Sequence, residues 1–111
     1  MLTNEGVIRL RDAIILSAVE EYKKSLATIK KLIERRESMI RRNDDFSAMR
    51  VARKIAEVYS DDVERLERFF RSQWFATLTT IKPESIIEHF RSEYGINFHP
   101  QLSSSISDEN M

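Results

Sequence analysis

Apolar residues recur at intervals of three and four positions through the first third of the chain. This spacing places them on one face of an α-helix, and the stripe comprises Ile15, Val19, Tyr22, Leu26, Ile29, Ile33 and Ile40. The pattern predicts one amphipathic helix over residues 5–41, which would extend roughly 55 Å at 1.5 Å per residue. Because a helix of that length exceeds the diameter of a small globule, we expect an elongated hairpin or bundle.

The next segment, residues 42–47, predicts a reversal, because Asn and Asp tolerate turn geometry and Asp or Ser can cap the following helix. A second apolar stripe then consists of Ala48, Ala52, Ile55, Tyr59, Leu66 and Phe69. Asp62 falls within this stripe and leaves two alternatives. Either the helix is continuous and the Asp62 carboxylate reaches solvent or a lysine of the first helix, or the helix breaks and Ser60 or Asp61 caps a new one. We favour the continuous helix.

A third helix is predicted after a turn at residues 79–84, with Pro83 at its first position and Gly95 just past its end. Its apolar face is formed by Ile86, Ile87, Phe90 and Tyr94. Beyond Gly95 the polar, serine-rich composition predicts a flexible tail over residues 96–111, which leaves a single helical domain over residues 1–95. The expected fold is all-α: a long antiparallel helical hairpin with a short third helix packed at one end.

Four of the ten aromatic residues lie within residues 69–75. On one continuous helix Phe70 and Trp74 share a face, whereas Phe75 points about 240° away from Phe69. We interpret the run as core that the third helix covers, and the predicted aromatic cluster comprises Phe69, Phe70, Trp74, Phe75 and Phe90. Two alternatives remain open: an exposed anchor for a protein partner, and a stacking platform for nucleic-acid bases.

The chain contains 18 basic and 18 acidic residues and has no net charge, but the charges are segregated. Residues 1–22 contain two basic and four acidic residues, residues 23–54 contain eleven and four, and residues 57–111 contain five and ten. A hairpin would gather the basic excess around its tip. The candidate binding residues are Lys24, Lys31, Arg35 and Arg42 on an outward stripe of the first helix, with Arg50, Arg53 and Lys54 across the turn.

This basic tip differs from the later part of the second helix, where acids and bases four positions apart compensate each other. The pairs there are Asp61–Arg65, Glu64–Arg68 and Glu67–Arg71. We expect carboxylates at this spacing to lie on exposed helix faces with ordinary solvation. An uncompensated basic stripe can bind nucleic-acid phosphates or an acidic protein surface. It can equally be a solvated face that keeps the protein soluble, or pair with acids of a second copy in an antiparallel dimer.

The residue types that catalysis and metal binding require are sparse. The chain has no cysteine and two histidines, His89 and His99, and His89 with Glu93 supplies at most two metal ligands. It has no glycine-flanked nucleophile turn and no glycine-rich phosphate loop. We therefore expect no enzyme activity, metal, cofactor or small-molecule substrate. The apolar stretch at residues 13–19 is too short to span a membrane, and the lack of cysteine favours a reducing cytoplasm.

The segment Glu67–Phe75, followed by Leu78-Thr79 and a helix containing Ile86-Ile87, resembles one found in small uncharacterised helical proteins encoded by phages, prophages and conjugative elements of Gram-positive bacteria. Ala18–Leu26 is similar, more loosely, to the first helix of those proteins, so the resemblance covers about residues 12–92. It transfers no catalytic residue. It implies an accessory protein of a mobile element, a class that includes inhibitors and adaptors acting on host machinery and antagonists of host defence nucleases.

The chain departs from that pattern in its acidic Ser60-Asp61-Asp62 stretch and its serine-rich tail. The missing catalytic groups, the segregated charge and the resemblance predict a non-enzymatic, protein-binding regulator of a mobile element. One such role is inhibition of a host or defence protein, such as a CRISPR nuclease, in the cytoplasm of a bacterial host. The alternatives are a nucleic-acid-binding factor that uses the basic tip, and a self-assembling helical scaffold. We expect chain pairing, because a homodimer could complete a four-helix bundle.

Overall fold

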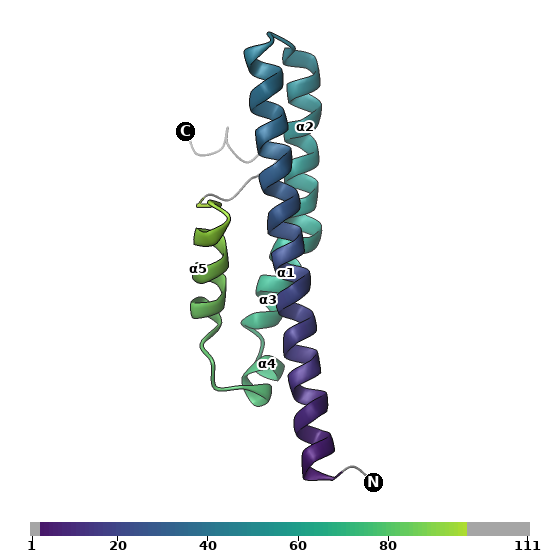
Figure 1. Ribbon diagram of the computed structural model, residues 1–111, viewed down its shortest axis with the longest axis vertical. Coiled ribbons are helices and arrows are strands. Elements are labelled where there is room, and N and C mark those ends of the chain that lie inside the picture. Colours follow the sequence, from purple (N-terminus) through teal and green to yellow (C-terminus); the bar gives the residue numbers. More distant parts are fainter. Residues whose placement is uncertain (1–2, 98–111) are drawn as a thin grey trace, which may run out of the picture.

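Every regular element in residues 3–97, the part of the chain that the computed structural model describes, is a helix (Figure 1). In chain order these elements are α1 (Asn4–Arg41), α2 (Asp45–Val58), the π-helix η1 (Tyr59–Val63), α3 (Glu64–Phe70), α4 (Gln73–Leu78) and α5 (Pro83–Glu93). The predicted all-α class is confirmed for these residues.

Helix α1 begins within one residue of its predicted start and ends at the predicted residue. Its first turn is capped by Thr3, whose Oγ1 accepts a hydrogen bond from the Gly6 N–H at 2.9 Å. The chain reverses through Asn43, which has a φ of 61°, and Asp44 caps α2 by accepting a hydrogen bond from the Ser47 N–H at 3.2 Å. Helix α2 then lies alongside the C-terminal half of α1 in a molecule that measures 60 × 33 × 22 Å (Figure 1).

The chain stays helical through Asp62, as favoured from the sequence, but the helix widens there into the π-helix η1. The Glu64 N–H donates to the Tyr59 carbonyl, five residues back instead of four. A π-turn of this kind shifts the phase of the residues that follow it. Tyr59 and Val63 are both buried, whereas the Asp62 side chain is half exposed and its carboxylate lies 3.9 Å from the Arg65 guanidinium.

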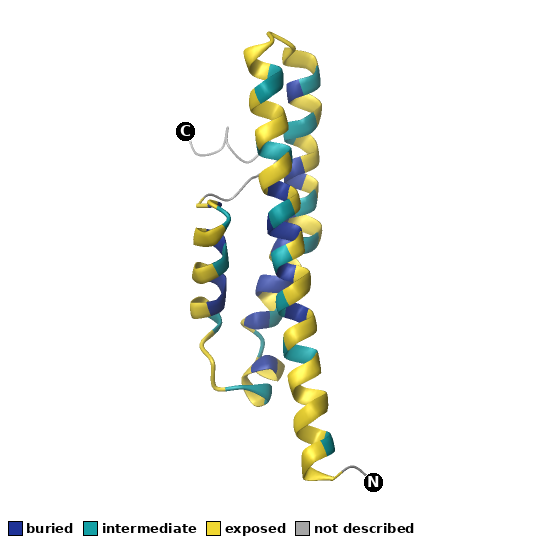
Figure 2. Ribbon diagram, in the orientation of Figure 1, coloured by how far each residue is buried: buried dark blue, intermediate teal, exposed yellow. Residues whose placement is uncertain are grey.

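The core lies in the middle of the molecule, where α1, α3 and α5 meet (Figure 2). Its largest fully buried side chains are Tyr22, Leu26, Ile29, Tyr59, Val63, Phe70, Phe75 and Ile96. The first turns of α1 extend beyond this core and carry exposed apolar side chains, among them Val7, Leu10 and Leu16 (Figure 2). Each buried apolar side chain stabilises the fold by roughly 1.5–3 kcal/mol relative to exposure, so stability is concentrated in the central third of the molecule.

Helix α5 begins at Pro83, as predicted, and Gly95 follows its end with a φ of 70°. This left-handed residue turns the chain so that the Ile96 N–H donates to the Arg91 carbonyl at 2.8 Å. Ile96 is fully buried. Ile96, one residue past the predicted domain boundary at residue 95, therefore packs in the core. The rest of the predicted tail, residues 98–111, lies outside the described residues.

The aromatic run does not form the single continuous helix that was predicted. The chain breaks at Ser72, whose Oγ caps α4 by accepting a hydrogen bond from the Phe75 N–H at 3.2 Å. The break turns Phe75 inward, where its ring centroid lies 5.3 Å from that of Phe70 in an edge-to-face contact. Both rings are fully buried, which two faces of one straight helix would not allow.

Trp74 is not covered by α5, contrary to prediction. Its side chain is 54% exposed because the break at Ser72 that turns Phe75 inward points Trp74 outward. The Trp74 ring retains one aromatic neighbour, Phe69, at 5.8 Å between centroids. Phe90 is half-buried, and its ring contacts His89 and the Lys23 ammonium. The predicted aromatic cluster therefore has a buried centre, Phe70 and Phe75, and an exposed edge at Trp74.

Candidate partner-binding groove

The seven basic residues predicted as binding residues are all exposed, but the structure divides them into two groups. Four line one groove beside α1 and α2: Arg35, Arg50, Arg53 and Lys54. The other three lie on or just beyond α1 outside the lining of that groove: Lys24, Lys31 and Arg42. Lys24 lies roughly 27 Å from Arg42 along the helix axis. The predicted basic residues therefore extend beyond the lining of this one groove.

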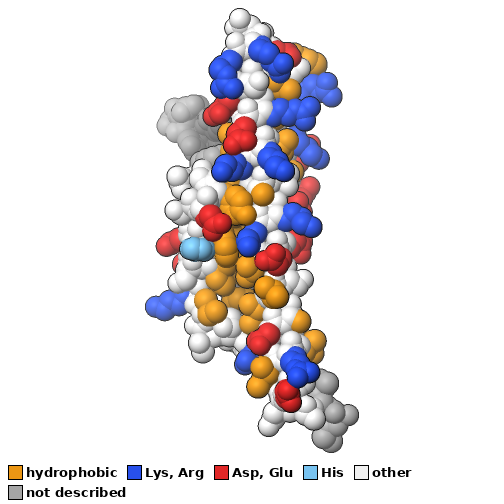
Figure 3. Space-filling view, viewed as in Figure 1, with side chains coloured by type: hydrophobic (Ala, Val, Ile, Leu, Met, Phe, Trp, Pro, Cys, Tyr) orange, Lys and Arg blue, Asp and Glu red, His pale blue; other side chains and the backbone are white. Residues whose placement is uncertain are grey.

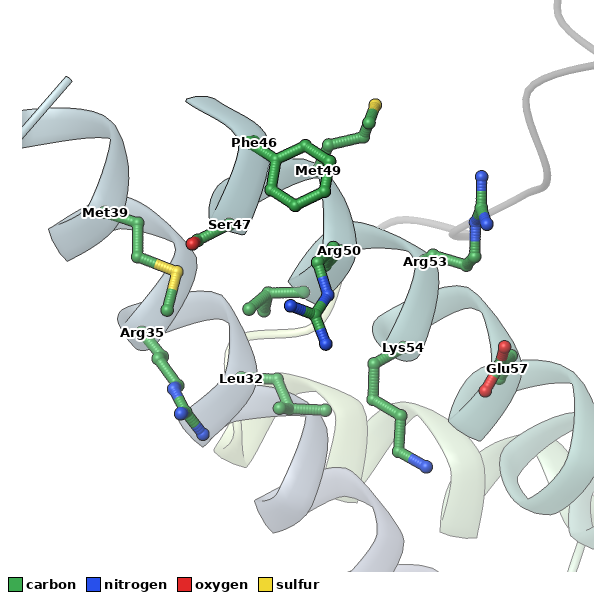
Figure 4. Close-up of a pocket in the computed structure, with 11 residues that line it drawn as sticks. Leu32, Arg35, Met39, Phe46, Ser47, Met49, Arg50, Arg53, Lys54 and Glu57 are labelled. Carbon is green, nitrogen blue, oxygen red and sulfur yellow. The ribbon is translucent and has the colours of Figure 1, made fainter. Parts of the chain in front are cut away.

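We call this groove the tip groove, because it lies near the end of the molecule where α1 and α2 are joined. It has a volume of about 670 Å³ and is lined by Leu32, Arg35, Met39, Phe46, Ser47, Met49, Arg50, Val51, Arg53, Lys54 and Glu57 (Figure 4). Met39 points from α1 towards α2, and Arg50 and Lys54 extend from α2 towards α1. Arg53 points away from this space, so it forms the outer edge of the groove.

Apolar side chains in the tip groove are exposed to an unusual degree. Phe46 is 67% exposed and Met49 is 56% exposed. They lie three residues apart in the first turns of α2 and therefore share one face of that helix. The Arg50 guanidinium lies 6.0 Å from the centre of the Phe46 ring, within the range of a cation–π contact. These apolar residues were absent from the predicted site, although the spacing of Phe46 and Met49 could have revealed their shared face.

The basic side chains of the tip groove form no ion pair with any acid of the described part of the chain. Within residues 3–97, no ion pair involves any residue between positions 24 and 61. Basic side chains gather at the end where α1 and α2 are joined, with apolar side chains between them (Figure 3). Within residues 3–97, the charges of the four basic residues that line the groove are thus not compensated by acidic residues, as predicted. Its positive charges are available to an acidic ligand.

Of the three ion pairs predicted farther along the chain, Glu67–Arg71 is present, whereas Asp61–Arg65 and Glu64–Arg68 are not among the ion pairs of residues 3–97. Arg65 donates to a Glu21 carboxylate oxygen of α1 at 2.5 Å and does not pair with the Asp61 carboxylate. Arg71 lies 3.8 Å from the expected Glu67 but donates at 2.7 Å to Glu84 of α5. This hydrogen bond is the main cause that lowers the pKa of the Glu84 carboxyl. The Arg65–Glu21 and Arg71–Glu84 pairs therefore tie helices together, in addition to the Arg65–Asp62 and Arg71–Glu67 pairs along one helical segment.

A buried polar cluster lies in the core, away from the tip groove. The Tyr22 hydroxyl donates to Glu67 Oε2 at 2.6 Å, and Arg91 Nε donates to the same oxygen at 2.8 Å. Arg91 also donates to the Tyr59 hydroxyl and, at 3.3 Å, to the Ile96 carbonyl. Glu67 is 4% exposed and Arg91 is 9% exposed. The prediction that Glu67 lies on an exposed face with ordinary solvation is therefore wrong.

The spacing of Val63, Glu67 and Phe70 could have indicated this burial, because positions i, i+4 and i+7 share one helix face. Within the described residues, no buried side-chain nitrogen or oxygen lacks a hydrogen-bond partner. Burial, reinforced by the hydrogen bond to Glu67, raises the pKa of the Tyr22 hydroxyl far above its ordinary value. Burial opposes the charge of Arg91, but its hydrogen bond to Glu67 raises the pKa of its guanidinium overall. The cluster holds α1, α3 and α5 together with an ionised pair at its centre.

The described residues contain no group of three or more metal-binding side chains. His89 lies on exposed α5, with Nε2 3.5 Å from a carboxylate oxygen of Glu93. His99 lies outside the described residues. Within residues 3–97, no helix is long and apolar enough to cross a bilayer.

Comparisons with known protein families, with curated proteins and with solved structures each returned no match.

Proposed function

We propose that this chain is a non-enzymatic binding protein that holds a protein partner in the tip groove. One observation carries the proposal: exposed apolar side chains line the same groove as basic side chains that pair with no acid of residues 3–97. Aromatic residues and Arg are enriched where binding energy is concentrated, and Phe46 and Arg50 bring both types together. Contiguous exposed apolar side chains with a polar rim are typical of interaction surfaces.

The proposal is tested by affinity capture from host cell extract with three forms of the protein. In Met49→Glu, a charge replaces an exposed apolar residue of the groove, and we expect the recovered partner to fall about tenfold. The control Lys30→Glu replaces an exposed basic residue of α1 that lies outside the groove lining. We expect this variant to recover the partner within about twofold of the amount recovered by the unchanged chain. Circular dichroism confirms that both variants fold. Equal recovery with all three forms contradicts the proposal.

The resemblance in the aromatic segment supports a narrower version of this proposal. The partner is then a host or element-encoded protein that the chain regulates or blocks, for example a defence nuclease. The direction of regulation is measured by adding the chain to the activity assay of each captured partner. Inhibition that Met49→Glu relieves is the expected result, and unchanged partner activity rejects an inhibitory role.

Nucleic acid is a second candidate ligand, because the basic side chains of the tip lack ion-pair partners. Under this alternative, a labelled duplex binds at low salt and its affinity falls steeply as salt is raised. Reversing the charge of Arg35 and Arg42 would then abolish binding. Absence of binding in about 50 mM salt, where phosphate contacts are strongest, eliminates this candidate.

Chain pairing is a third proposal, and the exposed apolar side chains in the first turns of α1 support it. Val7, Leu10 and Leu16 are each about half exposed or more, and a second copy is the simplest partner that would bury them in a larger bundle. If pairing continued beyond the dimer, the chain would form the self-assembling helical scaffold. Light scattering at high protein concentration tests it, and a strict monomer rules it out.

A further inference from the structure

We propose that the segment bound by the tip groove is an acidic amphipathic α-helix of the partner protein. This inference rests on the proposed function, because it names the chemistry of the ligand at the same groove. It is argued from three properties of the groove: the helices that form its walls, the side chains on its floor, and the position of its charges.

The walls favour a helical ligand. Residues Leu32–Met39 of α1 and Ser47–Lys54 of α2 each span two helical turns, which is roughly 10 Å of groove on each side. Both walls have their backbone hydrogen bonds inside their own helices, so they present side chains only. An extended peptide would leave its own N–H and C=O groups without partners over an apolar floor, whereas a helix satisfies them internally.

The floor requires apolar anchors on that helix. We take as its floor the half-buried side chains of the lining, Leu32, Met39 and Val51, beside the exposed side chains of Phe46 and Met49. Methionine side chains are flexible and adapt to ligand side chains of different shape. Apolar residues at positions i, i+3 or i+4 and i+7 of a ligand helix would fill such a groove. A phosphate backbone has no group that could cover this floor, so the apolar lining favours protein over nucleic acid.

The charges require acids on both flanks of the ligand. Arg35 stands on the α1 side, and Arg50 and Lys54 stand one helical turn apart on the α2 side. Among the described residues that line the groove, Glu57 is the only acid, and it lies farthest along α2 from the joined end. A ligand helix with Glu or Asp beside its apolar stripe would therefore be steered into the groove and held in register. A helix with basic flanks would meet like charges.

The test uses two synthetic helices of about 18 residues, stapled so that both are helical, with the same leucine stripe. One carries Glu on both flanks of the stripe and the other carries Lys. Fluorescence anisotropy measures the binding of each labelled peptide to the full chain. We expect the Glu helix to bind at least about tenfold more tightly than the Lys helix. Its affinity is expected to fall as salt is raised from about 50 to 300 mM.

Substitutions then locate the binding. Arg50→Glu is expected to weaken binding of the Glu helix about tenfold and to reduce the difference in affinity between the Glu helix and the Lys helix. Lys30→Glu is expected to leave the affinity for the Glu helix within about twofold of that of the unchanged chain. Arg50 and Lys30 are both exposed, so neither substitution disturbs the core, and thermal unfolding verifies this. Equal affinity for the two helices, no binding of either, or binding unaffected by Arg50→Glu overturns the inference.

The capture experiment separates this inference from the proposed function. If Met49→Glu abolishes capture of a host protein but the Glu helix does not bind, the groove binds a protein of other chemistry and only the inference fails. If capture is unaffected by Met49→Glu, the proposed function fails as well. A labelled duplex that binds and is lost with Arg50→Glu, while the Glu helix does not bind, assigns the groove to nucleic acid.

Discussion

Removing the carboxylate of Glu67 is a perturbation for which the structure predicts a large loss of stability. Glu67 Oε2 accepts hydrogen bonds from Tyr22 and Arg91 at 2.6 and 2.8 Å, and the Arg91 side chain is only 11% exposed. In Glu67→Gln the side chain keeps its shape and one oxygen acceptor, but the buried guanidinium loses its counter-charge. Arg91 cannot release its proton to relieve this, because the pKa of a guanidinium lies above 12.

Breaking a buried pair by removing one partner costs about 3–5 kcal/mol. Glu67→Gln falls near the lower end of that range, since a neutral acceptor remains, and Glu67→Ala falls near the upper end, because it also leaves a cavity. Both values are large against the stability of about 5–15 kcal/mol that is typical of a domain. Because 1 kcal/mol shifts Tm by about 4–8 °C in a domain of this size, Glu67→Gln is expected to lower Tm by about 12–24 °C.

Urea unfolding followed by circular dichroism measures these differences, with Glu64→Gln on the exposed side of the same helix as the matched control. We expect the control to lie within about 0.5 kcal/mol of the unchanged chain. The double variant Glu67→Leu, Arg91→Met removes both charges and is expected to recover part of the loss. It does not recover all of it, because the hydroxyls of Tyr22 and Tyr59 lose partners. A cost below about 1 kcal/mol for Glu67→Gln would refute burial of the pair.

Three further predictions concern stability. The pKa of Tyr22 is raised in the folded chain, so the stability that its neutral hydroxyl contributes is fully present below the ordinary pKa of 10.0 and is lost as pH rises above that value. Tyr22→Phe should therefore reduce the loss of unfolding free energy at alkaline pH, measured by urea unfolding over a range of pH. An unchanged dependence on pH would contradict this prediction. Ser72→Ala should lower the free energy of unfolding by about 1 kcal/mol, because it removes the N-terminal cap of α4, whereas Ser92→Ala at an exposed position should be nearly neutral. Equal effects of the two substitutions would argue against the helix break at Ser72. Gly95→Ala should cost about 1 kcal/mol through left-handed backbone strain alone, since an added Cβ meets nothing within 4 Å; a stabilised Gly95→Ala chain would contradict the observed φ.

The elements with strong local signals were predictable from the sequence. The stripe of α1 predicted the helix from residue 5 to residue 41, against Asn4–Arg41 in the structure. Pro83 and Gly95 likewise marked the limits of α5, because one favours the first helical position and the other the left-handed residue after the end. These signals depend on nearest neighbours along the chain, so they need no knowledge of tertiary packing.

The features set by tertiary packing were missed. The π-turn at Tyr59–Val63 changes the phase of the helix, so a stripe extrapolated through Asp62 at constant period includes buried Leu66 but misses Val63, Glu67 and Phe70, which are buried as well. Glu67 looked solvated because Arg71 stands four residues away, whereas its closer partners come from α1 and α5. In the same way, seven basic residues were identified, but the apolar floor that distinguishes four of them was not.

The central claim, that the tip groove holds a protein partner, is tested most directly by photo-crosslinking in living host cells. A photoreactive amino acid is placed at Met49 in the groove and, as the matched control, at Glu88 on exposed α5. The account predicts a discrete protein adduct from position 49 that Arg50→Glu removes, and none from position 88. No adduct from position 49, or equal adducts from both positions, would contradict it.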